Sequence, residues 1–171
     1  LSTIAFALLS DRKILLNQYQ DKTLFDSQRR VAFDRLMCNA VFLTIYYLGT
    51  GQTETLNMFL DDVWVCKNTG SSRIIIEGFK TRGNTIETRS FTPRATCKHF
   101  FESHLALSKR HSTALGLDKH YLFRKTNGSI PNTDNLRIYA QDYLVKNSER
   151  IQKLIAENPD FKLNSNLLKS S

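Results

Sequence analysis

The chain of 171 residues has little cysteine and no apolar run long enough to cross a membrane. Cys38, Cys66 and Cys97 lie about 30 residues apart, without a Cys-x-x-Cys pair. This usage argues against a disulfide framework and predicts a protein of the reducing cytoplasm. The longest mostly apolar stretch, residues 40–48, is half of a membrane span, and residues 1–9 lack a signal-peptide pattern. We therefore expect no membrane partner.

The local signatures of several enzyme classes are also missing. The sequence contains no Gly-x-x-x-x-Gly-Lys phosphate loop, no His-Glu-x-x-His and no Gly-x-Ser-x-Gly. Four histidines, His99, His104, His111 and His120, lie within 22 residues, without zinc-ligand spacing to the cysteines. We interpret them as surface or interface residues. The sequence thus predicts neither a metal site nor a cofactor.

Basic residues are in excess, and the excess is confined to one part of the chain. With 41% hydrophobic and 23% charged residues, the composition is that of one soluble globular domain. The net charge is 24 − 16 = +8. Residues 1–66 carry 6 basic and 7 acidic groups, whereas residues 67–171 carry 18 and 9, a surplus of +9. A surplus of this kind favours an anionic partner such as nucleic acid.

Apolar spacing predicts a mainly helical chain interrupted by a few strands. Helices are expected over 2–20 and 27–48, the second apolar enough to be a central core helix, and Gly49-Thr50-Gly51 ends it in a turn. β-Branched and alternating residues predict three strands of a meander around 63–66, 73–76 and 85–91. Four further helices are expected at 53–60, from Pro93 to 107, at 133–146 and at 148–157. The predicted fold class is α+β.

The glycine turn and the short helix after it resemble a known signature. Residues 49–63, GTGQTETLNMFLDDV, are similar to the first motif of the tyrosine recombinase (phage integrase) family, Thr-Gly-x-Arg-x-x-Glu-Leu-x-x-Leu-x-x-x-Asp-Ile. Glu54, Leu56, Met58 and the closing Asp62-Val63 set the register.

The resemblance continues in the family's order over about 130 residues. Phe79-Lys80-Thr81-Arg82-Gly83 is similar to the family's hairpin with its Lys-Thr-x-x turn, and Asn166-Leu167-Leu168-Lys169 falls where the family has His-x-Leu-Arg. Two shorter matches lie between them, residues 91–93 against Val-Pro-Leu and residues 122–128 against Leu-Phe-x-x-x-x-Gly. The resemblance implies a mainly helical, tyrosine-recombinase-like catalytic core with a small three-stranded antiparallel sheet.

The family's catalytic positions can be assigned one by one in this register. Members cleave DNA with a tyrosine that forms a 3′-phosphotyrosyl link, helped by two arginines, a lysine, a histidine and a second histidine or tryptophan. Glu54 and Lys80 keep the family's residues. Gly51 stands at the first arginine, Asn166 at the histidine and Lys169 at the second arginine. The resemblance implies that the tyrosine and the last His/Trp lie beyond residue 171.

The three departures weaken the chemistry that the family requires. Gly51 has no side chain, Asn166 does not exchange a proton near pH 7, and Lys169 lacks the guanidinium fork. Since one lost charge-stabilising donor costs about 10²- to 10³-fold in rate, we expect no strand cleavage by this chain alone. One alternative stays open, in which Arg82 or Arg89 reaches the phosphate from the hairpin.

The basic residues of the sheet and the next helix form the predicted DNA-binding surface. A stripe of cations tracks a phosphate backbone, although a plain charged face has the same composition. The predicted stripe consists of Arg73, Lys80, Arg82, Arg89, Arg94 and Lys98, with Lys119, Arg124, Lys125 and Arg137 as a possible extension. Without the family resemblance, Lys80 is interpreted as a solvated lysine of the hairpin. Glu54 is then interpreted as a helix residue that is solvated or paired with a basic group. Five tyrosines are expected in or near the core and not as nucleophiles, namely Tyr46, Tyr47, Tyr121, Tyr139 and Tyr143.

The resulting functional hypothesis is a DNA-binding, tyrosine-recombinase-like protein in the integration or recombination of a mobile element. The chain is expected to be a single domain over 1–171, a catalytic-core fragment without the family's N-terminal DNA-binding domain and C-terminal tyrosine segment. Its expected partners are double-stranded DNA and other recombinase subunits. Two alternatives are a non-catalytic DNA-binding accessory of a recombination complex and a protein interaction module.

Overall fold

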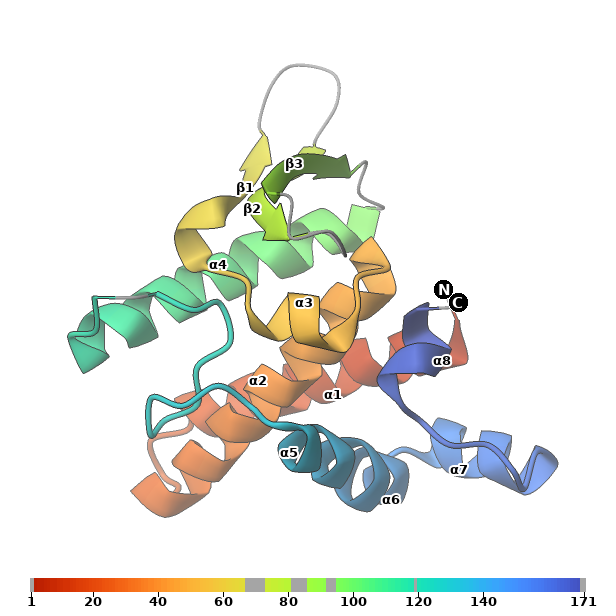
Figure 1. Ribbon diagram of the computed structural model, residues 1–171. Helices are drawn as coiled ribbons and strands as arrows, with labels where there is room; N and C mark the ends of the chain where they lie inside the picture. Colours follow the sequence, from red (N-terminus) through yellow and green to blue (C-terminus); the bar gives the residue numbers. More distant parts are fainter. Residues whose placement is uncertain (1, 67–72, 81–85, 92–94, 119, 170–171) are drawn as a thin grey trace.

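Two long helices form the centre of the molecule, which we describe from a computed structural model. The backbone is described for residues 2–66, 73–80, 86–91, 95–118 and 120–169, and the side chains for 2–63, 96–118, 120–165, 167 and 168. Helices α1 (Thr3–Gln20) and α2 (Asp26–Leu48) pack against each other (Figure 1). Ser2 caps α1, its Oγ accepting from the Ala5 amide at 3.1 Å.

Helix α2 is buried on almost every side from its middle onward. Every residue from Leu36 to Ile45 is buried, as expected for a helix that is apolar all round. Among the described residues α2 is long and apolar enough to cross a membrane, and 72% of its most apolar window is buried inside the fold. It ends at Gly49, which adopts a left-handed φ of 67° and donates its amide to the Ile45 carbonyl at 2.8 Å.

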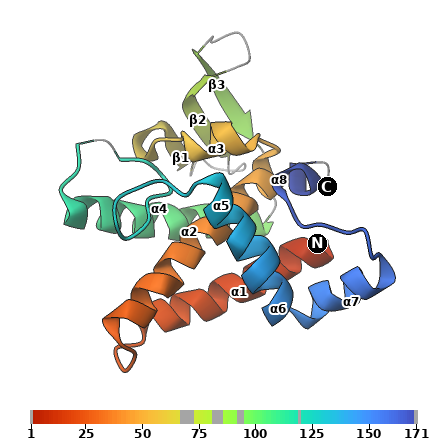
Figure 2. The same cartoon turned by 60° about the horizontal axis from the view of Figure 1, so that its bottom comes forward.

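A small sheet lies at one edge of the helical body. Helix α3 (Gln52–Leu56) and the 3₁₀ turn η1 (Leu60–Asp62) lead into it. Its three antiparallel strands, in the order β1-β2-β3, are β1 (Val63–Cys66), β2 (Arg73–Lys80) and β3 (Ile86–Phe91). The sheet stands over α3 and over α4 (Ala95–Leu115), and β1 contacts α4 (Figures 1 and 2).

The rest of the chain wraps the other side of α1 and α2. One nearly continuous rod consists of α5 (Thr133–Arg137), the π-helical turn η2 (Ile138–Leu144) and α6 (Val145–Asn147). After α7 (Glu149–Glu157), the chain returns to α2 and ends in the short helix α8 (Ser165–Lys169).

The α+β fold class expected from the sequence is wrong, because the body whose side chains the structure describes is all-α. Its core is built by the helices and the segments that join them, and the strands add only Val63 to it. The α+β expectation counted the three-stranded sheet as a main part of the fold. Helices supply most of the described core, in which Phe100 and Phe101 of α4 and Leu168 of α8 belong to one cluster with α2.

The short helix expected over 53–60 is also wrong at its end, since α3 stops at Leu56. Phe59 is extended and forms a bridge with Tyr121, and η1 begins at Leu60. The Leu60 amide donates to the His120 carbonyl at 2.6 Å, and the Leu122 amide donates to the Met58 carbonyl at 2.9 Å. These tertiary hydrogen bonds override the local helical preference of Leu56, Met58 and Phe59.

Candidate functional site

The turn between α2 and α3 is held by its own hydrogen bonds. Glu54 Oε2 accepts from the Gly51 amide at 3.1 Å, which ties the side chain to the start of α3. Thr50 Oγ1 and Thr55 Oγ1 lie 2.7 Å apart, and Thr55 donates to the Gly51 carbonyl at 2.7 Å. The segment that resembles the family's first motif is thus a fixed turn in which Glu54 caps a helix.

Gly51 is not a glycine that the backbone demands. Its φ of −74° and ψ of 163° suit any residue, and an added Cβ would meet Glu54 Oε2 at 3.7 Å, an ordinary contact. Neither the backbone nor the space around a Cβ therefore requires glycine at this position.

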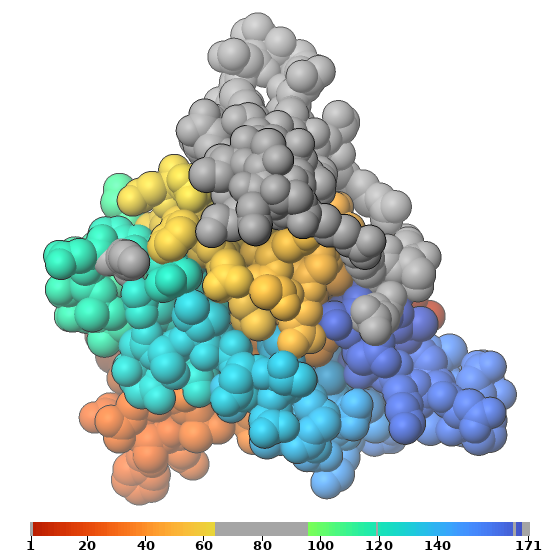
Figure 3. All heavy atoms as spheres, in the orientation of Figure 1, coloured from red at the N-terminus to blue at the C-terminus, as the bar shows by residue number. Residues whose placement is uncertain are grey.

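Gln52 joins α3 to two distant segments. Its Oε1 accepts from Ser165 Oγ of α8 at 3.1 Å, and its Nε2 donates to Thr133 Oγ1 of α5 at 3.2 Å. Ser165 directly precedes the segment 166–169 that matches the family's His-x-Leu-Arg. In space-filling view α3 lies at the surface between the α5 segment and α8 (Figure 3). The first and last matched motifs are therefore neighbours in space.

Helix α8 is anchored by Leu168, which is 1% exposed in the core. Asn166 and Lys169 belong to this helix by their backbone, and their side chains lie outside the described residues. The helix that carries two family positions therefore packs beside the turn that carries Gly51 and Glu54.

Lys80 ends strand β2, where it pairs with Ile86 of β3. Arg73 pairs with Cys66 and Arg89 with Ile76, so both arginines lie on the sheet. The side chains of these three cations are outside the described residues.

Of the other basic residues, only part is described. Arg82, Arg94 and Lys119 lie outside the described residues, whereas Lys98 is half-buried on α4. Arg124 and Lys125 are half-buried, and exposed Arg137 faces Asp134 with its Nε 3.8 Å from Oδ1. The stripe of basic residues therefore stays a prediction.

The expectation that the five tyrosines belong in or near the core is confirmed. Tyr139 is 2% exposed and the other four are half-buried. The Tyr139 hydroxyl donates to Asp11 Oδ2 at 2.6 Å and accepts from Asn39 Nδ2 at 2.9 Å. Burial raises the pKa of Tyr139 well above its usual range, so this hydroxyl stays protonated.

The histidine interpretation is wrong for His104. Its ring is fully buried between Phe100 and Phe123, with Nε2 3.0 Å from the Leu122 carbonyl. Burial and the charge of Arg12 lower its pKa to about 3. Its position in α4 beside apolar neighbours could have signalled this. No group of three or more His, Cys, Asp or Glu in the described part of the chain could hold a metal ion.

Gln52, Ser165 and Thr133 were not predicted from the sequence. Their partnership depends on segments brought together by the whole fold, and no local spacing signals it. No family model, curated protein or solved structure matches this chain. The functional assignment therefore rests on the motifs and on the contacts described above.

Proposed function

We propose that this chain binds duplex DNA as a tyrosine-recombinase-like component in the integration or recombination of a mobile element, and that it holds the DNA without cutting it. The observation that carries the proposal is the contact between α3 and α8 through Gln52 and Ser165. The two motifs that match the family lie more than 100 residues apart in the sequence, and a chance match would not require them to meet.

The location of the basic residues favours a phosphate backbone as the partner. Strands β2 and β3, which carry Arg73, Lys80 and Arg89, stand on the same side of the body as α3 (Figures 1 and 2). Cations on this side of the body would contact the phosphates of a duplex.

The chemistry of the matched positions favours holding over cutting. A cleavage site must stabilise charge on a pentacoordinate phosphate, for which bidentate guanidinium groups are best suited. Gly51 offers only a backbone amide, and that amide already donates to Glu54. Lys169 supplies a point charge and Asn166 a neutral amide, which can contact a phosphate but not transfer a proton.

Salt-dependent binding to a duplex tests the DNA contact. In the test variant Arg73, Lys80 and Arg89 are all replaced by Ala. The matched control replaces Lys146, Lys153 and Lys162, exposed cations of the α6–α8 region away from the sheet, and removes the same charge. Each lost phosphate contact lowers the slope of log affinity against log salt by about 0.9, so the test variant is expected to lose about 2.7. Equal slopes in both variants, or no salt dependence in the native chain, would contradict the proposal.

A nicked suicide duplex tests the absence of cleavage. We expect this chain to bind the duplex without forming a covalent protein–DNA adduct. An adduct resolved by denaturing electrophoresis would show that the substituted site cuts DNA. The thermal midpoint of each variant is measured in parallel, so that loss of folding is not read as loss of binding.

A further inference from the structure

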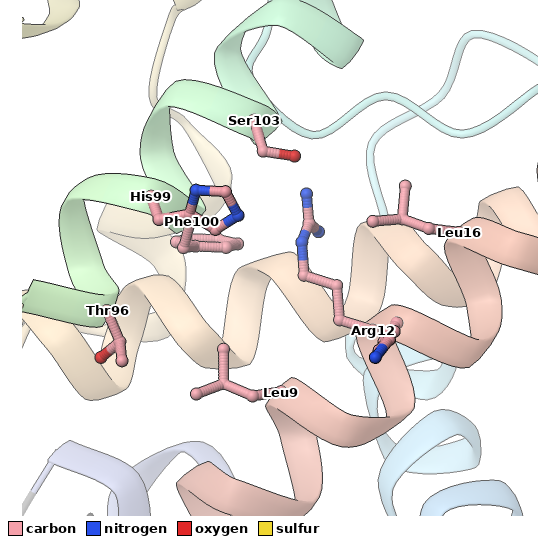
Figure 4. A pocket seen from close by; sticks show the side chains of 8 residues that line it. Leu9, Arg12, Leu16, Thr96, His99, Phe100 and Ser103 are labelled. Carbon is pink, nitrogen blue, oxygen red and sulfur yellow. The ribbon is translucent and has the colours of Figure 1, made fainter.

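A pocket lies between α1 and α4, on a side of the molecule that the proposed function does not use. Its volume of about 570 Å³ lies in the range of small-molecule sites. Leu9 and Leu16 of α1 and Phe100 of α4 supply its apolar wall (Figure 4). A ligand with an apolar body would pack against this wall.

A single buried cation stands in the wall of this pocket. Arg12 is 5% exposed, and its side chain extends between α1 and α4 toward Ser103 (Figure 4). Within the described part of the chain, neither Nη1 nor Nη2 has a hydrogen-bond partner. The neighbouring carboxylate of Asp11 is engaged by Tyr139 instead.

The contacts that Arg12 makes offset only part of its burial. Its Cζ lies 4.8 Å from the centroid of the Phe100 ring, a cation–π contact that replaces part of the lost hydration. The rest of the cost of burying the ion remains until its donors find acceptors. Burial lowers the pKa of Arg12 to about 10, so the guanidinium remains charged at neutral pH. Two buried donors of a charged fork are thus left without an acceptor, and an anion that reached them would satisfy both.

The remaining polar groups of the pocket also suit an anion. Lys13 and His99 are exposed at its rim, and the hydroxyl of Ser103 lies beside the guanidinium (Figure 4). Among the residues that the structure describes, those that line the pocket include no Asp or Glu. An entering ligand with a positive charge would meet only repulsion.

We propose that this pocket binds a small monocarboxylate with an apolar chain, its carboxylate on the fork of Arg12 and its chain against Leu9, Leu16 and Phe100. A carboxylate matches the planar fork with two parallel hydrogen bonds. A phosphate carries more charge and more acceptors than one guanidinium in an apolar wall can satisfy. The proposal does not depend on DNA binding.

Calorimetric titration with decanoate, below the concentration at which it forms micelles, tests the site. We expect one decanoate per chain, at least tenfold weaker binding of decanol, and no binding of decylamine. Arg12→Met keeps the volume of the side chain without its charge and is expected to weaken decanoate at least tenfold. Arg30→Met, which removes an exposed arginine of α2, is the matched control and is expected to change nothing.

The outcomes that overturn the proposal are distinct. Absence of decanoate binding, equal binding by Arg12→Met, or equal binding of decylamine would each refute it, and tighter binding of decyl phosphate would refute the choice of carboxylate. If Arg12→Met does not fold, Leu16→Trp narrows the pocket without touching the cation. It is expected to weaken decanoate at least tenfold, and unchanged affinity would refute the site.

Discussion

Tyr139→Phe removes one hydroxyl that links three parts of the fold. The group donates to Asp11 of α1 and accepts from Asn39 of α2, while Tyr139 itself belongs to η2. A hydrogen bond to a charged partner contributes about 1.5–3 kcal/mol and a neutral one about 1 kcal/mol. The variant is thus expected to lose about 2.5–4 kcal/mol of unfolding free energy, or about 5–15 °C in thermal midpoint for a chain of this size.

The loss is expected to depend on pH through Asp11. Burial raises the pKa of this carboxyl above its usual value, and the Tyr139 hydroxyl opposes that shift. Because the pKa of Asp11 is higher in the folded chain than in the unfolded chain, its carboxyl contributes to stability at pH values below the unfolded pKa. This contribution is lost as the pH rises through the folded pKa. Without the hydroxyl the ionised form has one stabilising partner fewer, so the variant loses more at pH 7 than near pH 4.

Urea unfolding followed by circular dichroism at both pH values measures this loss. Tyr19→Phe is the control, because Tyr19 is half-buried and its hydroxyl has no hydrogen-bond partner in the described part of the chain. It should change the unfolding free energy by less than about 0.5 kcal/mol. A Tyr139→Phe loss no larger than that of Tyr19→Phe at pH 7 would refute the network as described.

Three further predictions concern individual residues. Gly49→Ala should lose about 1–2 kcal/mol, because its φ of 67° is left-handed, whereas Gly51→Ala at a φ of −74° should be neutral or up to about 1 kcal/mol more stable; equal effects in urea unfolding would contradict this. The imidazole of His104, with its pKa near 3, should not titrate between pH 8 and about pH 5 by NMR. Because its folded pKa is lowered, its contribution to stability is present above about pH 6.5 and is lost as pH falls toward 3. Burial raises the pKa of Cys38 to about 12, so mass spectrometry after thiol labelling at pH 8 should find Cys38 unmodified until the chain is unfolded; rapid native labelling would contradict its burial.

Sequence reasoning succeeded where the signal was local. Apolar spacing and Gly49 predicted α1 and α2 to within two residues at each end. The turn that carries Gly51 and Glu54 was located by its glycines. These features depend on residues within one or two turns of each other, so a short window contains all the information.

Sequence reasoning failed where distant segments decide. The end of α3 depends on hydrogen bonds to the segment around Tyr121, and the role of Gln52 depends on Thr133 and Ser165. The predicted fold class is wrong for the same reason. How much a sheet contributes to the core depends on which distant segments cover the central helix α2. Arg12 follows Leu8 and precedes Leu15 at core-facing spacing, a pattern that could have marked it as a buried cation.

The contact between Gln52 and Ser165 has a consequence for how the candidate site forms. It closes a loop of more than 100 residues, so its entropic cost is met only once most of the chain is in place. One side of this contact is a helix of five residues that Leu168 fixes to the core. A change that loosens α8 is therefore expected to disrupt the contact while α1 and α2 remain intact.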